Sequence, residues 1–336
     1  MGICYERAEP LCHSLGRPLL LYSVLIGRWL YSFHTDKMTA TMQLAERVYS
    51  LAQEQNDAAL MIGAYRVLAA TFCCMGDFET SRQYAMQGVQ IWRSGSVQSP
   101  VAEVLAQVVA CLCHRGWSEW HLGEIASSQA TTTEVISLAK KLNDMNVLAL
   151  ALFQAGFVGH FERDPAEVER CASNMIELST RHNFAFWRAA GEVLRGWAQS
   201  ISGSTAVGIA RIEQGIRDIR ATGTVVDVPY WLALKAEVLH LADHTSEALE
   251  AITEAEALVV RTEARWWCAE LNRLRGVFLA TLGAEETQIE ASFSAAIRIA
   301  REQKSVSLAK RAEGTYAEYR RQKASVSEGR GFRLPL

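Results

Sequence analysis

Apolar residues recur at helical spacing along most of the chain, in long segments separated by short polar or glycine-containing turns. The turns are expected at Asp36, Gly76, Gly116, Arg163, Gly203, Asp243 and Gly283, which gives intervals of 40, 40, 47, 40, 40 and 40 residues. Each interval holds two amphipathic segments. A fixed period of this length is typical of helix hairpins that bury their faces against neighbouring copies. The pattern therefore predicts an all-α fold, an α-solenoid of about seven two-helix hairpins wound into a right-handed superhelix.

The phase of the turns divides the chain into repeats and ends. Repeats are expected at approximately 18–56, 57–98, 99–145, 146–183, 184–223, 224–263 and 264–304. Helices at 5–15 and 306–321 have no partner in this phase, so each is expected as an orphan helix at one end of a single domain, 1–321. Residues 322–336 have the composition of a flexible tail. The one long interval contains the polar run Ser127–Thr133, which is expected as a lengthened loop or a distorted helix.

Small and basic residues recur in phase with the turns. Seven residues before a turn the chain carries Ala69, Gly156, Gly196, Ala236 and Gly276, and small side chains let two helices approach closely. One residue earlier, a basic side chain recurs at Arg28, Arg195, Lys235 and Arg275. Stacked repeats place equal phases in a row, so these cations are expected to form a ladder. Trp187 and Trp267 share another phase, and Trp231 follows it by one helical turn.

These four cations and three tryptophans are the candidate partner-binding residues. In the functional interpretation they lie in a concave groove, lined by the first helix of each pair, that takes an acidic or extended segment of a protein partner. In the structural interpretation the tryptophans fill gaps between repeats and the cations pair with Glu192, Glu237 or Glu270. The residue pattern leaves both open.

Composition narrows the classes of partner and the compartment. The chain has 336 residues, with 34 Lys and Arg against 37 Asp and Glu, so it has no overall positive field for nucleic acid or an anionic membrane. The longest apolar stretch expected, Leu19–Gly27, is too short to span a bilayer. Eight cysteines include no C-x-x-C pair, which indicates a reducing compartment. We expect a cytoplasmic protein without a nucleic-acid or membrane partner.

The motifs of catalysis and metal binding are missing from the sequence. It contains no G-x-x-x-x-G-K-[ST] phosphate loop, no H-E-x-x-H, no G-x-S-x-G and no G-x-G-x-x-G. Glu237, His240 and His244 have suitable helical spacing for a metal, but His244 follows the turn at Asp243 and is expected to leave the helix. Cys111 and Cys113 are closer together than the cysteines of common zinc sites. The sequence therefore predicts a non-enzyme with no catalytic residue, metal or cofactor.

Three stretches carry a family resemblance: 58–78, 183–198 with Leu-Arg-Gly at 194–196, and 261–276 with Arg-Trp-Trp at 265–267 and Leu-Arg-Gly at 274–276. They resemble the carboxy-terminal tetratricopeptide-like region of large bacterial signalling proteins. In that family a class III adenylate cyclase or DNA-binding domain precedes a P-loop ATPase module and the helical array. The resemblance covers roughly residues 3–321. It implies a regulatory or sensor part that works with a cyclase or P-loop ATPase module. Catalytic activity is not carried over, because the phosphate loop is missing.

The sequence thus predicts a non-catalytic interaction scaffold of a bacterial signalling system. Two alternatives remain: a separated fragment of an adenylate cyclase or ATPase polypeptide that lacks its catalytic modules, or a small-molecule-sensing array such as that of maltose-type transcriptional activators, with a tryptophan-lined pocket. Self-association is expected as well, because the end helices carry apolar side chains without a capping repeat. They are Leu11 and Leu15 at one end and Leu308, Ala312, Tyr316 and Tyr319 at the other.

Overall fold

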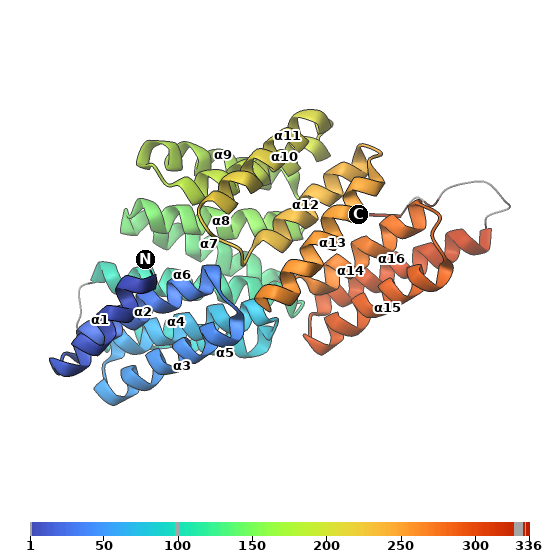
Figure 1. Ribbon diagram of the computed structural model, residues 1–336. Coiled ribbons are helices and arrows are strands. Elements are labelled where there is room, and N and C mark those ends of the chain that lie inside the picture. The colour runs from blue at the N-terminus through green and yellow to red at the C-terminus, as the bar shows by residue number, and fades with distance from the viewer. Residues whose placement is uncertain (1, 98–100, 326–331, 333) are drawn as a thin grey trace.

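The structure, a computed structural model, describes residues 2–97, 101–325, 332 and 334–336. These residues form sixteen α-helices, and no β-strand occurs among them (Figure 1). The first helices of the hairpins are α2 (Pro18–Thr35), α4 (Ala58–Met75), α6 (Val101–His121), α8 (Met145–Phe161), α10 (Ala185–Ile201), α12 (Val228–Leu241) and α14 (Cys268–Thr281). The second helices are α3 (Met38–Gln55), α5 (Phe78–Arg93), α7 (Ile125–Leu142), α9 (Pro165–His182), α11 (Thr205–Ala221), α13 (Thr245–Thr262) and α15 (Glu286–Glu302). The unpaired end helices are α1 (Gly2–Ser14) and α16 (Val306–Ser325).

The helices stack in chain order, so the prediction of an all-α solenoid with an unpaired helix at each end is confirmed. Local sequence explains where the helices begin and end. Aspartates at the N-caps of α4, α5, α8 and α9 accept hydrogen bonds from the first backbone N–H groups. Residues with left-handed backbone follow several second helices, as at Asn56, Asn143 and Asn183. Asparagine tolerates this conformation better than most residues, which explains the short two-residue connections.

The turn expected at Gly116 is wrong. α6 continues through Gly116 to His121, and the chain turns at Gly123, which has a φ of +85°. Gly123, Arg163, Gly203, Asp243 and Gly283 then follow one another at equal steps of 40 residues, all with positive φ. Gly116 is instead a packing glycine, because a Cβ there would lie 2.8 Å from Gln154 Nε2. It therefore belongs to the small-residue phase seven positions before the turn.

Because the chain turns at Gly123 and not at Gly116, the extra residues of the long interval lie in a different part of the chain than expected. Ser127–Thr133 lies inside the regular helix α7, so the expected loop or distortion there is wrong. The longer connection lies upstream, where α5 ends at Arg93 and α6 begins at Val101. Part of that connection, residues 98–100, lies outside the described residues.

The C-terminal segment departs from the expected flexible tail where the structure describes it. α16 continues to Ser325, four residues beyond the expected end at 321. Phe332 packs on Tyr319, with ring centroids 4.9 Å apart, and Leu334 is buried. The carbonyl oxygen of Pro335 accepts a hydrogen bond of 3.0 Å from Arg273. Residues 326–331 and 333 of the expected tail lie outside the described residues.

The superhelix is wound tightly enough for its early hairpins to touch its late ones. Val225 donates a backbone hydrogen bond to the carbonyl oxygen of His34, and Arg265 donates one to Cys74. One repeat further on, Ser307 bonds to the carbonyl oxygen of Trp120. In Figure 1 the blue, green-to-yellow and orange-to-red helices accordingly occupy three sides of one body. The first helices are enclosed by this winding.

The first helices are buried because the winding of the superhelix encloses them. α8 and α12 are buried almost all round, and apolar residues occupy most positions of both helices. α4 is also apolar; by length and hydropathy it is the one helix of the described residues that could cross a membrane, and 56% of it is buried inside the fold. We interpret α4 as a core helix of the solenoid.

Candidate interaction sites

The four predicted cations lie half-buried beside the preceding second helix. Each forms an ion pair with a glutamate of that helix: Arg28 with Glu9, Arg195 with Glu169 at 2.9 Å, Lys235 with Glu213 at 2.8 Å, and Arg275 with Glu256 at 2.6 Å. The glutamates named in the structural interpretation are not their partners. The corrected turn adds Arg115 to the same phase, where it pairs with Glu119 at 2.7 Å. The four predicted cations therefore tie a first helix to the helix before it, whereas Arg115 pairs within its own helix α6.

The three predicted tryptophans do not share one environment. Trp231 and Trp267 are 0% and 1% exposed and lie inside the molecule. Trp187 is half-buried, and its Nε1 donates a hydrogen bond of 2.8 Å to Asn146 Oδ1 on the preceding repeat. The structure therefore brings Trp231 and Trp267 into the core and leaves Trp187 nearer the surface.

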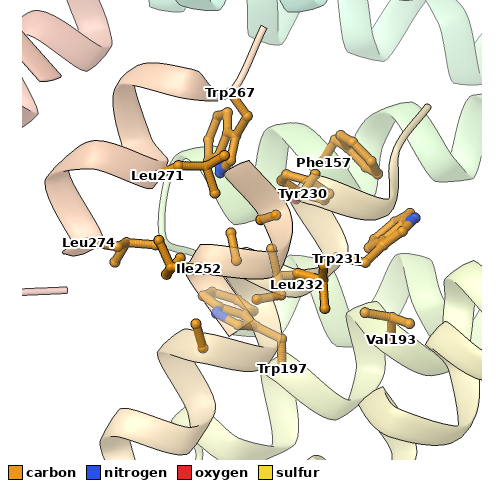
Figure 2. Close-up of a cluster of buried hydrophobic side chains, with 14 of the residues drawn as sticks. Phe157, Val193, Trp197, Tyr230, Trp231, Leu232, Ile252, Trp267, Leu271 and Leu274 are labelled. Carbon is orange, nitrogen blue, oxygen red and sulfur yellow. The ribbon is translucent and has the colours of Figure 1, made fainter. Parts of the chain in front are cut away.

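Aromatic side chains fill the interior where the first helices converge. Figure 2 shows Phe157, Tyr230, Trp231 and Trp267 from three different hairpins in one buried cluster. Phe157 stacks on Tyr230 with ring centroids 4.3 Å apart, and Trp231 meets Phe157 edge to face at 5.2 Å. Offset and edge-to-face pairs of this kind are favourable beyond their buried area. The part of the interior that Trp231 and Trp267 were expected to offer to a partner is occupied by the chain's own rings.

A buried ion network lies next to the aromatic cluster. Arg163 contacts the carboxylates of both Glu237 and Glu270, the latter at 3.3 Å. Glu270 also accepts hydrogen bonds from Arg273, at 2.8 and 2.9 Å, and from Arg311 at 3.2 Å. These five side chains come from the turn after α8 and from α12, α14 and α16. The network therefore joins the hairpins that begin with α8, α12 and α14 to the end helix α16.

The network sets the ionisation of its members. Burial by itself would raise the pKa of Glu270, but the guanidinium groups of Arg273 and Arg311 hold that pKa at about 2. Burial opposes ionisation of Glu237 too, and the charge of Arg163 keeps the pKa of Glu237 well below its usual range. His160, beside Glu237, has a pKa lowered to about 4 by burial. Both carboxylates are therefore ionised and His160 is neutral at pH 7.

A pocket of about 730 Å³ opens where the second hairpin meets the last ones. Its walls come from the turn between α4 and α5 and from α13, α14 and α15. Two of its cations are already paired, Lys304 with Glu79 and Arg298 with Glu302. Gly76 is required at its edge, because its φ is +86° and a Cβ there would lie 2.3 Å from Gln303 Nε2. The residues lining this pocket include no tryptophan.

The two ends of the solenoid differ in how far their apolar side chains are exposed. Leu11 and Leu15 of the N-terminal end are 62% and 67% exposed, together with Leu19 and Leu20 at the start of α2. At the C-terminal end Leu308, Ala312 and Tyr319 are 1–2% exposed, and Tyr316 is half-buried. The expectation of an uncapped C-terminal end is wrong, because α14, α15 and the last residues of the chain cover α16. The apolar side chains expected to be exposed at the N-terminal end, Leu11 and Leu15, are exposed.

The three residues considered from the sequence as metal ligands, Glu237, His240 and His244, do not come together. His240 bonds to Thr245 Oγ1 at 3.0 Å, and His244 bonds to Glu247 at 2.8 Å. Glu237 points instead into the ion network described above. Within the described ranges, no three His, Cys, Asp or Glu side chains come together in an arrangement for a metal ion.

The sequence interpretation gave no functional role to Arg273, Arg311 or the residues of the pocket, and it named Glu237 and Glu270 only as possible partners of the recurrent cations, with Glu237 also as a possible metal ligand. Arg163 was assigned only as a turn residue, and its partners Glu237 and Glu270 lie 74 and 107 residues later. One signal was available: Glu237, Glu270 and Arg273 are charged residues between apolar residues of first helices. Charged side chains in such positions are rarely left without a partner.

Comparisons with known proteins agree on the fold. No protein-family model matches the chain. It is 26% identical, over 201 residues, to the uncharacterized protein R02095 of Rhizobium meliloti (strain 1021). That match covers 60% of this chain, and the chain spans about a fifth of the relative, 20% of its length.

Solved structures with the same architecture are more distant in sequence. The chain is similar to the apo form of RapI, with a TM-score of 0.59, 12% identity, and coverage of 84% of this chain and 98% of that one. It is similar to a Rap protein complexed with Competence and Sporulation Factor, with a TM-score of 0.59, 14% identity, and coverage of 84% and 75%. Aspartyl phosphate phosphatase F from Bacillus subtilis gives a TM-score of 0.57, 12% identity, and coverage of 89% and 75%. These likenesses confirm a tetratricopeptide-like helical fold.

Proposed function

We propose that this chain is a non-catalytic protein-interaction scaffold, the regulatory part of a cytoplasmic bacterial signalling system, and that its partner docks on the N-terminal end of the solenoid. The observation that carries the proposal is the exposure of four leucines around the turn between α1 and α2: Leu11, Leu15, Leu19 and Leu20 are 53–67% exposed. We call these four residues the N-terminal apolar face. Several exposed large apolar side chains in one short segment of a folded protein are typical of an interaction site.

The repeat geometry says what would fit this face. In every complete hairpin a second helix packs on its own first helix and on the first helix of the next repeat. α1 has the position of a second helix and packs mainly on α2. An amphipathic helix could therefore dock on α1 as a further repeat does. We propose that a cyclase or P-loop ATPase module of the same signalling system supplies this helix, as the family resemblance implies.

The comparison with the Rhizobium meliloti protein favours a closely related possibility. That protein is similar to this chain over only 20% of its length. An array of this kind can thus be one part of a much longer polypeptide. In a separated fragment of a cyclase or ATPase polypeptide, the N-terminal apolar face would bind the missing modules in trans. The small-molecule alternative called for a tryptophan-lined pocket, and the pocket beside α13–α15 has different walls.

A charge-introducing variant tests the docking face. Leu15→Asp combined with Leu19→Asp places two carboxylates in the centre of the N-terminal apolar face. Val260→Asp is the matched control, because Val260 is an apolar side chain of α13 that is 80% exposed. Each purified chain is titrated with the cyclase and ATPase modules encoded beside it in its genome, by light scattering and calorimetry. We expect at least a tenfold loss of affinity, about 1.4 kcal/mol, for the double variant and none for the control.

Equal affinity of the double variant and the unchanged chain would contradict the proposal, and so would the absence of any complex with either module. Circular dichroism verifies that the double variant is folded. If the unchanged chain alone forms a dimer that the double variant loses, the face is a self-association surface and the assigned partner is wrong.

A further inference from the structure

Arg66 differs from every other arginine that the structure describes. It lies in the middle of the apolar helix α4 and is half-buried, and its Nε is shielded from solvent without a hydrogen-bond partner. No carboxylate among the described residues pairs with it, and the ionisable groups that act on it are Tyr22 and Cys111. The other described arginines either pair with a carboxylate or lie exposed at the surface. Among the arginines in the described ranges, Arg66 is the one partly buried guanidinium without a carboxylate partner.

Its surroundings hold the guanidinium in place without neutralising it. The guanidinium carbon of Arg66 lies 4.9 Å from the ring centre of Trp29, a cation–π distance. Trp29 is itself fixed by a hydrogen bond of 3.0 Å from its Nε1 to Thr71 Oγ1. Burial raises the pKa of Tyr22 and raises that of Cys111 to about 12, so both are neutral at pH 7.

Two polar side chains of α6, the helix that packs on α4 where Cys111 contacts Ile62, have hydrogen-bonding atoms without a partner. His114 is close enough for the charge of Arg66 to help lower its pKa to about 3, after the larger effect of burial, so His114 is neutral at pH 7. Its Nδ1 is buried without a partner. Gln107, two helical turns earlier, has a buried Oε1 without a partner. A Cβ at Gly63, one turn before Arg66, would lie 3.9 Å from that oxygen, so Gln107 reaches α4.

Each of the three residues is partly exposed, although Arg66 Nε, Gln107 Oε1 and His114 Nδ1 are themselves shielded from solvent, so a ligand must displace neighbouring side-chain atoms to reach those three. A half-buried cation without a carboxylate partner is incompletely hydrated, so an anion from outside the chain that pairs with it would be bound favourably. The guanidinium supplies a planar fork of donors, the imidazole supplies one N–H, and the amide can present its NH₂ or its oxygen. This combination suits a planar anion with two acceptor oxygens and an adjacent polar group, above the apolar face of Trp29.

We propose that Arg66, Gln107 and His114 form a binding site for the carboxylate of an acidic ligand. The site spans three consecutive first helices, α2, α4 and α6, and is separate from the N-terminal apolar face. The carboxylate could belong to an acidic side chain of a protein partner or to a small organic acid. The basic residues predicted from the sequence cannot serve in this way, because each already holds a glutamate of its own chain.

The experiment compares three probes at constant ionic strength and pH 7.5, followed by the melting temperature and by calorimetry. The probes are glutarate, a capped tetraglutamate peptide without a free C-terminus, and inorganic phosphate. A ligand that binds only the folded state raises the melting temperature in proportion to its affinity. We expect glutarate or the peptide to stabilise the unchanged chain more than phosphate does. Whichever of the two binds more tightly identifies the source of the carboxylate.

Arg66→Met is the main variant, and it is expected to melt at a higher temperature than the unchanged chain, because an uncompensated charge is removed. It should bind the carboxylate probes at least tenfold more weakly. Arg66→Lys keeps the charge without the fork and should also bind them more weakly. Arg275→Met, which removes a half-buried arginine with its own glutamate, is the control and should bind them unchanged.

Three results would overturn the proposal: no carboxylate probe stabilises the chain, phosphate binds more tightly than both, or Arg66→Met binds the probes as the unchanged chain does. A fall in the melting temperature of Arg66→Met together with unchanged binding would show that Arg66 only packs on Trp29. None of these results depends on the N-terminal apolar face, so the two proposals can fail separately.

Discussion

The backbone nitrogen of Arg265 donates a hydrogen bond of 2.8 Å to the carbonyl oxygen of Cys74. This bond joins the start of the last hairpin to the end of the first helix of the second hairpin. An open solenoid has contacts only between neighbouring repeats and can flex like a spring. Here non-neighbouring repeats are bonded to each other, and buried aromatic rings and ion pairs lie between them. We therefore expect a cooperative, stiff body in place of a flexible array.

The buried ion network is expected to be a major source of that cooperativity. Arg163→Met leaves Glu237, which is 0% exposed, without its strongest partner, and should lower the free energy of unfolding by about 3–5 kcal/mol. Arg181→Met is the control, because Arg181 and Glu177 form an exposed pair that contributes about 0–1 kcal/mol. Urea denaturation measures both. Equal effects of the two substitutions would mean that the network does not hold the repeats together.

We expect that glycine is required at positions seven residues before a turn, because the helices pack closely there. At Gly196 a Cβ would lie 2.7 Å from the backbone oxygen of Gly208 and 2.8 Å from a side-chain carbon of Ile212. Gly196→Ala should therefore destabilise the protein by about 1–3 kcal/mol. At Gly314, inside α16, a Cβ would meet nothing within 4 Å. Gly314→Ala should instead stabilise by about 0.5–1 kcal/mol, and thermal melting distinguishes the opposite signs.

Acid should weaken the contact at His34. Burial lowers the pKa of His34 to about 4, whereas an unfolded histidine titrates near 6.5. The unfolded chain therefore binds a proton first, so this contribution to stability is complete above pH 6.5 and is lost as the pH falls toward 4. The loss is up to about 3 kcal/mol. His34→Phe should remove this part of the pH dependence, measured as melting temperature from pH 7.5 to 4.5.

Asp227, near the same contact, acts in the opposite direction. Burial raises its pKa to about 7, so its contribution falls as the pH rises from about 4 to 7. It is present in both His34→Phe and the unchanged chain, so the difference between the two isolates His34. A difference that is constant across the pH range would contradict the assignment.

The recurrent cations are expected to contribute little individually. Arg195→Ala, Lys235→Ala and Arg275→Ala each break one pair whose basic side chain is 27–32% exposed, so each should lower stability by about 0.2–1 kcal/mol. The pairs lie in different repeats without shared partners, so the triple variant should lose about the sum. A much larger loss for the triple variant, measured by urea denaturation, would show that the cations interact as a ladder after all.

The repeat length and the regular positions of the turns made the architecture predictable from the sequence. Turns at Gly76, Arg163, Gly203, Asp243 and Gly283 are marked by residues that adopt positive φ, and the repeat length follows from their spacing. A turn was wrongly expected at Gly116, because glycine occurs both in turns and where two helices pack closely. Only the neighbouring Gln154 distinguishes the two uses, and that contact is not local in sequence.

The candidate sites were less predictable, for a physical reason. A repeat pattern specifies which residues share a phase but not how tightly the superhelix winds. That winding buries Trp231 and Trp267 and brings Arg163 to Glu270. Likewise, a basic residue in the sequence carries no sign of whether a glutamate is within reach. Arg28 has Glu9, and Arg66, in an equally helical segment, has no carboxylate among the described residues.

The pairing of Lys304 with Glu79 gives the most direct test of the closed superhelix, because it joins the last hairpin to the second. A carbodiimide that couples an amine to a carboxylate without a spacer, applied to dilute monomer and followed by peptide mass spectrometry, reports this contact. We predict a cross-link between Lys304 and Glu79 that disappears in Glu79→Gln. Cross-links confined to neighbouring hairpins, with none between the second hairpin and the last, would contradict the account.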